Sequence, residues 1–212
     1  MLVVHHLGIS QSDRIVWLCE ELGVPYELRL YARDPATRLA PADYRALTPF
    51  GTAPVITDGD LVLGESAAIV EYIAVRHGGG RLMVAPGAAN YPDFLFWFHF
   101  ANGSLMPAAM VDMLAGLFTG DAMDALVALR ARLDRAYDQI EARLADVPYL
   151  AGDDFTAADL LTMFPLTTMR MFAPRDLAAY PNIRVYLRRI ADRPAYARAM
   201  AKADPGFTAP LA

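Results

Sequence analysis

With 212 residues, of which 55% are hydrophobic and 20% charged, the chain can bury the core of one long domain or two small ones. Its net charge of -5 is modest, and its arginines are spread among acidic residues, which argues against a nucleic-acid partner. Cys19 is the single cysteine, and the amino terminus has neither a basic region nor a long apolar one. We therefore expect a cytoplasmic protein without an internal disulfide.

The first 76 residues alternate between strand and helix patterns. Residues 2–7 are apolar and β-branched and predict a strand, and the helix that follows ends at Gly23. A second strand, residues 26–31, completes a βαβ unit. After an irregular segment, residues 53–63 predict a hairpin with its turn at Asp58-Gly59, and residues 65–76 predict a helix.

The remainder of the chain shows only helical periods. Residues 78–89 are rich in Gly, Ala and Pro and are typical of a linker, and a long apolar helix is predicted over residues 91–118. We expect breaks between the later helices at Gly120, residues 148–152, Pro174, Pro181 and Pro194. Polar residues and prolines within residues 94–111 and 157–174 argue against a membrane span.

Several segments carry a family resemblance. Residues 5–27 (HHLGISQSDRIVWLCEELGVPYE), 49–56 (PFGTAPVI) and 64–69 (GESAAI) resemble, in order and spacing, the serine-type glutathione transferases of bacteria and fungi. Residues 96–107 are similar to the fourth helix of the branch typified by a yeast membrane-associated glutathione transferase. The resemblance covers nearly the whole chain.

That resemblance implies a fold class and a division of the chain. We expect an α/β plus all-α protein, with a thioredoxin-like glutathione-binding domain (βαβ-α-ββ-α) at residues 1–80. A linker at residues 81–89 would lead to a helical bundle at residues 90–212 that supplies the electrophile pocket. The resemblance also implies a homodimer.

A transferase of this kind gains rate by holding the glutathione thiolate at neutral pH. Lowering the thiol pKa by about two units from about 8.5 requires roughly 2.7 kcal/mol, which one charge-assisted hydrogen bond and a helix N-terminus can supply. Ser10 lies between the first strand and the first helix, and we predict it as the thiolate donor. The alternatives are Ser12 as the donor, or both serines as ordinary helix caps.

Glutathione, the expected co-substrate, would contact residues in three motifs: Gln11, Ser12, Thr52, Ala53, Pro54, Glu65 and Ser66. The resemblance implies a cis bond before Pro54, and the backbone of Ala53 can pair with a peptide ligand. Thr52 and Gln11 stand where the family often has lysine and arginine, which weakens two contacts to the glycyl carboxylate. Arg38 is a candidate substitute.

The second domain offers fewer signals. Aromatic residues lie on more than one face of the helix over residues 91–118, which indicates a second burial surface, either a dimer interface or the electrophile pocket. Met106 and Met110 are flexible and are predicted to line that pocket. His99 is interpreted as structural, Cys19 as an inert core residue and residues 156–159 (TAAD) as a helix cap. No metal is predicted.

The sequence thus predicts a transferase that joins the glutathione thiolate to a hydrophobic electrophile. Two alternatives remain at this point. One keeps glutathione but changes the reaction to peroxide reduction or isomerisation, and the other is a non-catalytic binding or scaffold protein.

Overall fold

The computed structural model describes residues 1–115 and 121–211 and divides the chain into two compact units. The first unit comprises Met1–Met83 and Asp192–Thr208. The second comprises Val84–Ala191 together with the residues from Ala209 onward.

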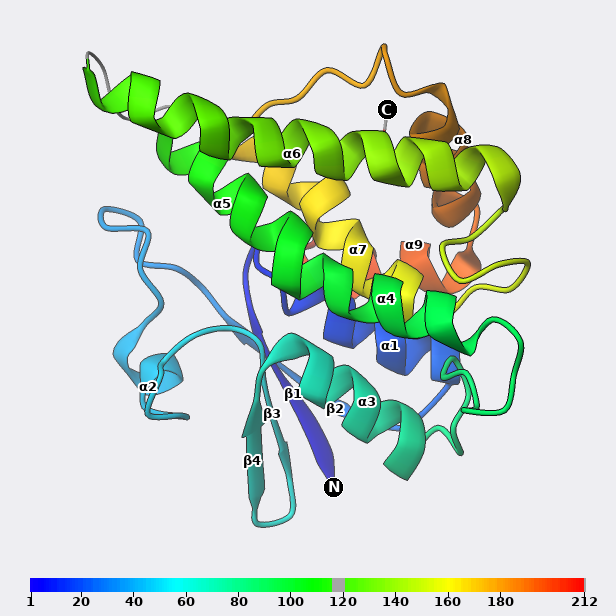
Figure 1. Cartoon of the computed structure of the whole chain (residues 1–212). Coiled ribbons are helices and arrows are strands. Elements are labelled where there is room, and N and C mark those ends of the chain that lie inside the picture. The colour runs from blue at the N-terminus through cyan, green and yellow to red at the C-terminus, as the bar shows by residue number, and fades with distance from the viewer. Residues whose placement is uncertain (116–120, 212) are drawn as a thin grey trace. The chain divides into compact units, whose positions relative to one another are not determined.

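A four-stranded mixed sheet in the order β2-β1-β3-β4 forms the centre of the first unit (Figure 1). Strand β1 (Leu2–Leu7) pairs in parallel with β2 (Glu27–Tyr31) and antiparallel with β3 (Val55–Asp58), which pairs antiparallel with β4 (Leu61–Gly64). All six residues of β1 are buried. Since side chains alternate along a strand, consecutive residues of β1 face opposite sides of the sheet.

Four helices accompany this sheet: α1 (Asp13–Leu22), α2 (Ala42–Arg45), α3 (Ser66–Arg76) and α9 (Pro194–Ala203). Helix α1 ends at Gly23, whose left-handed φ of 61° a glycine adopts without steric cost. Helices α1 and α3 pack against each other. The order of elements up to α3 confirms the predicted thioredoxin-like fold, including the βαβ unit and the hairpin, whose loop residues are Gly59 and Asp60.

Helix α9 returns from the end of the chain and packs along α1. The rings of Trp17 and Tyr196 meet edge to face with centroids 4.9 Å apart. Arg193 forms an ion pair with Glu21 at 2.7 Å. The first unit is thus completed by residues that follow the whole second unit in sequence.

The second unit is helical throughout its described elements. These are α4 (Tyr91–Phe100), a π-helical turn (Ala101–Leu105), α5 (Met106–Ala115), α6 (Asp121–Asp146), α7 (Ala157–Leu166), a short 3-10 turn (Thr168–Met171) and α8 (Pro181–Ala191). The second domain was predicted to be all-helical, and these elements confirm that prediction.

The predicted single helix over residues 91–118 is interrupted. The π-helical turn at Ala101–Leu105 precedes Pro107, whose ring lacks an N–H and clashes with the carbonyl four residues earlier in a regular α-helix. A wider turn relieves that clash. The predicted end of this helix at Phe118 and the break at Gly120 lie outside the described residues.

One helical stretch, Tyr91–Leu114, is long and apolar enough to cross a membrane by length and composition alone. Half of its most apolar window is buried inside the protein.

The predicted helix cap at residues 156–159 is confirmed as a capping box at the start of α7. The backbone N–H of Thr156 donates to Asp159 at 2.8 Å. The same buried carboxylate accepts the N–H of Leu150 at 2.9 Å and the hydroxyl of Tyr186 at 3.0 Å. Asp159 therefore joins the start of α7 to the preceding loop and to α8.

We predict that Asp159→Ala lowers the free energy of unfolding by about 3–5 kcal/mol, because several buried donors lose their acceptor at about 1–3 kcal/mol each. Urea denaturation at neutral pH measures this change. Asp154→Ala is the control, because it removes an exposed carboxylate from the same segment of the chain. It should change the free energy of unfolding by no more than about 0.5 kcal/mol. Equal stabilities for the two variants would contradict the assignment.

Candidate functional site

The turn between β1 and α1 is strained. Ile9 has a φ of 49°, a left-handed conformation that β-branched residues rarely adopt and that costs about 1–3 kcal/mol. Its backbone N–H donates to Oδ1 of Asp204 at 2.9 Å, and the N–H of Gly8 donates to the carbonyl of Tyr31 at 3.0 Å. The turn is therefore held both by β2 and by the segment that follows α9.

Ser10 and Ser12 lie together in this turn. Ser10 donates its hydroxyl hydrogen to the carbonyl of Leu7 at 2.6 Å, and its Oγ lies 2.7 Å from the Oγ of Ser12. Ser10 is 5% exposed, whereas Ser12 is completely buried. Of the two hydroxyls, that of Ser10 is the one nearer to solvent.

Ser12 occupies the N-cap position of α1, but its side chain does not cap the helix. The Ser12 hydroxyl instead accepts the backbone N–H of Leu7 at 3.1 Å and lies 2.9 Å from Nδ1 of His6. The interpretation of Ser12 as an ordinary cap is therefore wrong. Its hydroxyl belongs to a buried polar network beneath the turn.

His6 extends this network to the end of the chain. The imidazole is 1% exposed, and its Nε2 lies 3.2 Å from Oδ2 of Asp204. Burial acts to raise the pKa of Asp204, but the close contact with His6 and its charge, the N–H of Ile9 and the charge of Arg33 outweigh it and leave that pKa below its usual value. Sequence reasoning missed both His6 and Asp204.

Arg14 connects two of the predicted site residues. Its side chain is almost fully buried, and its Nη2 donates to Ser66 Oγ at 2.9 Å and to Oε1 of Gln11. Burial lowers the pKa of Arg14 to about 10, while the adjacent Asp13 opposes that change. The structure thus brings Gln11 and Ser66 together through a cation that the sequence reasoning did not single out.

The remaining predicted residues of the first unit lie at the ends of loops. The Ala53–Pro54 peptide bond is cis, as the family resemblance implied. Ala53 is half-buried against the cluster of Leu7, Tyr44 and Val55. The other three are exposed: Thr52, Glu65 at the N-cap of α3 and Arg38.

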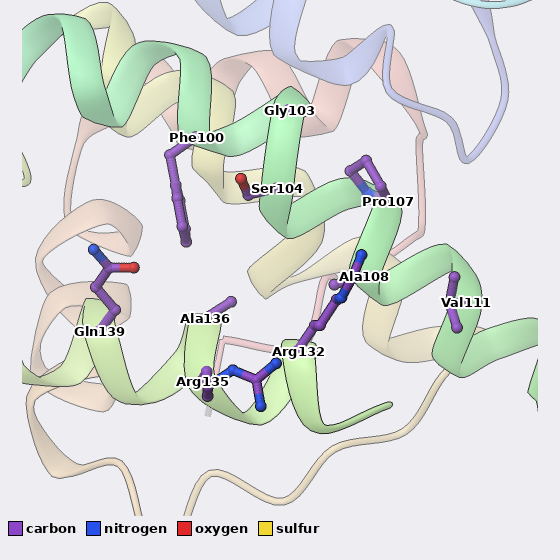
Figure 2. Close-up of a pocket in the computed structure, with 10 residues that line it drawn as sticks. All are labelled: Phe100, Gly103, Ser104, Pro107, Ala108, Val111, Arg132, Arg135, Ala136 and Gln139. Atoms are coloured by element: carbon purple, nitrogen blue, oxygen red, sulfur yellow. The ribbon is translucent and has the colours of Figure 1, made fainter. Parts of the chain in front are cut away.

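The predicted pocket residues of the second unit differ in exposure. Met106 is 8% exposed and Met110 is 38% exposed. A cavity of about 310 Å³ lies between the helices of this unit, and neither methionine is among the ten residues that line it (Figure 2). Figure 2 shows Phe100 and Ser104 on one wall and Arg132, Arg135 and Gln139 along the facing helix α6.

Two further predictions concern the reactivity of Cys19 and the binding of a metal ion. Burial raises the pKa of the Cys19 thiol to about 12, as expected for an inert core cysteine. Among the side chains that the structure describes, those of residues 1–114 and 130–211, no group of three or more His, Cys, Asp or Glu is placed to hold a metal ion.

Comparisons with known proteins agree on one family. The family model described as "Glutathione S-transferase, N-terminal domain" matches residues 10–76, and the corresponding C-terminal domain model matches residues 105–194. Glutathione S-transferase 3 of Schizosaccharomyces pombe is 33% identical, over 92% of this chain and 85% of its own. Glutathione S-transferase 1 of Saccharomyces cerevisiae is 26% identical over 96% and 95%. A crystal structure of a glutathione S-transferase from Actinobacillus pleuropneumoniae superposes with a TM-score of 0.87 at 32% identity, over 100% of this chain and 98% of that one.

Asp13 generates a testable pH dependence. Burial raises its pKa to about 6, although Arg14 and His6 act to lower it. A carboxyl whose pKa is higher in the folded than in the unfolded state favours folding more as the pH falls through that window. We therefore compare the free energies of unfolding of wild type and Asp13→Asn. As the pH falls from 7 to about 4.5, the wild-type value should rise relative to that of Asp13→Asn by about 2 kcal/mol.

Urea denaturation of both proteins at the two pH values measures this gain. Asp60→Asn, which removes an exposed carboxylate, controls for the change in net charge. A constant difference in stability between wild type and Asp13→Asn would mean that Asp13 titrates normally.

Proposed function

This chain belongs to the glutathione S-transferase family, and from that premise we propose that Ser10 holds the thiolate of glutathione for attack on a hydrophobic electrophile. The observation that carries the proposal is the position of the Ser10 hydroxyl, at the end of β1 and before the first turn of α1. A hydroxyl there meets the positive end of the helix dipole. The deeper position of Ser12 favours Ser10 as the group that touches sulfur.

The required energy matches what such a site supplies. A hydrogen bond from a hydroxyl to an anionic sulfur contributes about 1.5–3 kcal/mol, and a helix N-terminus adds about 0.3–1 kcal/mol. Together these lower a thiol pKa by about 1–3 units, since one unit is about 1.4 kcal/mol. A thiol of ordinary pKa about 8.5 would then be largely ionised near neutral pH.

We assign the rest of glutathione to the three loops around the turn. Ala53 and Pro54 would meet the cysteinyl backbone, and Glu65 and Ser66 would meet the γ-glutamyl group. Arg14 supports this arrangement, because its bond to Ser66 fixes that hydroxyl relative to α1. Gln11, Ser12 and Thr52 complete the proposed binding set.

The domain and pocket assignments extend the proposal. Residues 1–80 would form the glutathione-binding domain, residues 81–89 the linker and residues 90–212 the domain with the electrophile pocket, lined by Met106 and Met110. We place the chain in the serine-type branch that resembles the yeast membrane-associated transferase, on the basis of residues 96–107. We also propose a cytoplasmic location.

The first prediction concerns Ser10→Ala. Losing one charge-assisted hydrogen bond should raise the pKa of bound glutathione by about 1–2 units and lower kcat/KM at pH 7 by roughly 10- to 100-fold. Ultraviolet absorbance of the bound thiolate across pH and turnover of a chromogenic aryl halide measure the two effects. Binding calorimetry checks that glutathione still binds.

Ser10→Thr keeps a hydroxyl at the same position and should retain most of the activity. Unchanged thiolate ionisation and turnover in Ser10→Ala would move the donor role to Ser12 or to the backbone. Absence of any thiolate in the wild-type protein would refute thiolate stabilisation altogether.

We further propose a homodimer that buries the exposed apolar side chains of α4 and α5. Leu95, Phe96 and Leu114 are 37–47% exposed along these helices, with Phe96 at 47%. Apolar side chains gathered on one helical stretch are typical of a surface that another chain covers.

Sedimentation velocity tests this proposal. Wild type should sediment with twice the chain mass of 23.2 kDa, and Phe96→Glu should shift the protein toward the monomer because it would bury a charge. Val185→Glu alters a similarly exposed side chain (44%) on α8 and should leave the dimer intact. A monomeric wild type would contradict the proposal.

A further inference from the structure

Four side chains form an unbroken polar chain beneath the β1–α1 turn. The Oγ atoms of Ser10 and Ser12 are 2.7 Å apart, Ser12 Oγ is 2.9 Å from His6 Nδ1, and His6 Nε2 is 3.2 Å from Asp204 Oδ2. Ser12 and His6 are at most 1% exposed. This row of four polar side chains therefore runs from the candidate thiolate site into the protein and ends at a carboxylate.

The contacts of these four side chains indicate where their hydrogens lie. Asp204 accepts the N–H of Ile9, and its lowered pKa keeps it ionised. Its negative charge, 3.2 Å from Nε2 in an ion-pair contact without hydrogen-bond geometry, favours the tautomer of His6 that carries its hydrogen on Nε2. In a neutral imidazole this leaves the lone pair on Nδ1, facing Ser12. Because Ser12 Oγ already accepts the N–H of Leu7, its own hydrogen points at that lone pair.

We propose that His6, reached through Ser12 and Ser10 and supported by Asp204, takes up the proton that the glutathione thiol loses on binding. This inference rests on the proposed role of Ser10. The S–H hydrogen passes to Ser10 Oγ, the Ser10 hydrogen passes to Ser12 Oγ, and the Ser12 hydrogen passes to Nδ1 of His6. One S–H bond breaks, one N–H bond forms, both serines end neutral, and no electrons leave the site.

The transfer also orients the donor that the thiolate requires. In the free protein, the single hydroxyl hydrogen of Ser10 is shared between two acceptors, the carbonyl of Leu7 at 2.6 Å and, since the Ser12 hydrogen faces Nδ1, the Oγ of Ser12 at 2.7 Å. Once His6 is protonated, Nδ1–H donates to Ser12, Ser12 donates to Ser10, and the hydrogen of Ser10 is directed to the sulfur anion. Proton uptake and thiolate stabilisation are then two results of the same rearrangement, and His6 acts as a positioning residue.

Two carboxylates face His6 from different elements. Asp204 approaches it from the segment after α9, and Asp13 acts on it from α1. The cations nearest to these carboxylates are Arg14, beside Asp13, and Arg33, whose charge acts on Asp204. An imidazolium between two acidic side chains has its charge compensated within the protein.

The test counts protons on binding. Glutathione and S-methylglutathione, which has no thiol hydrogen, are titrated into the full chain at a pH about two units below the ordinary thiol pKa of about 8.5. Thiolate is measured by ultraviolet absorbance, and protons are measured by calorimetry in buffers of different ionisation enthalpy. After subtraction of the S-methylglutathione value, wild type should form thiolate while releasing far fewer than about one proton per thiolate.

His6→Asn keeps an acceptor near Ser12 but cannot hold the proton. It should release about one proton per thiolate formed and need a higher pH to form it. Ser12→Ala, a smaller change that cuts the chain between Ser10 and His6, should behave likewise. His5→Asn is the matched control, because His5 is also buried in β1 but contacts Tyr31 and Thr57, and it should leave the proton count as in wild type.

Two failures are distinguishable in this experiment. Thiolate formed by the wild type with release of about one proton would overturn the relay and leave the role of Ser10 intact. A wild type that binds glutathione without forming thiolate would overturn the role of Ser10 as well. A proton count in His6→Asn or Ser12→Ala that matches wild type would also refute the relay.

Discussion

The carboxylate of Asp204 holds two groups that the site depends on. One oxygen accepts the N–H of Ile9, whose left-handed backbone is costly for a β-branched residue, and the other faces the imidazole of His6. One side chain therefore contacts both the strained turn that carries Ser10 and the imidazole that lies against Ser12.

A second buried charge serves a different purpose. Arg14 is desolvated, with Asp13 as its neighbour, and such buried ions seldom add net stability. What Arg14 does provide is geometry, since its guanidinium reaches both Gln11, in the β1–α1 turn, and Ser66, the first residue of α3 and more than fifty residues further along the chain. In the first unit, a buried charged side chain thus holds the β1–α1 turn at a fixed distance from the start of α3.

Local signals in the sequence were sufficient for most of the fold. The β1–α1–β2 unit, the hairpin and the capping box at Thr156 each depend on residues close together in sequence, whereas the cis bond before Pro54 was expected only from the family resemblance. The π-helical turn was missed because one proline reads as tolerable in an apolar helix. His6 was missed for another reason, since its partner Asp204 lies at the far end of the chain and no periodicity links them.

This distance in sequence also bears on what counts as the glutathione-binding domain. Residues 1–83 contain the sheet and Ser10, but the first unit is complete only with residues 192–208, which supply the α9 face against α1 and the carboxylate of Asp204. A chain that ended before α9 would leave the N–H of Ile9 and the imidazole of His6 without that acceptor. The chemistry we assign to the amino-terminal motif is therefore a property of a unit defined by contacts, and that unit includes residues that follow the whole second unit in sequence.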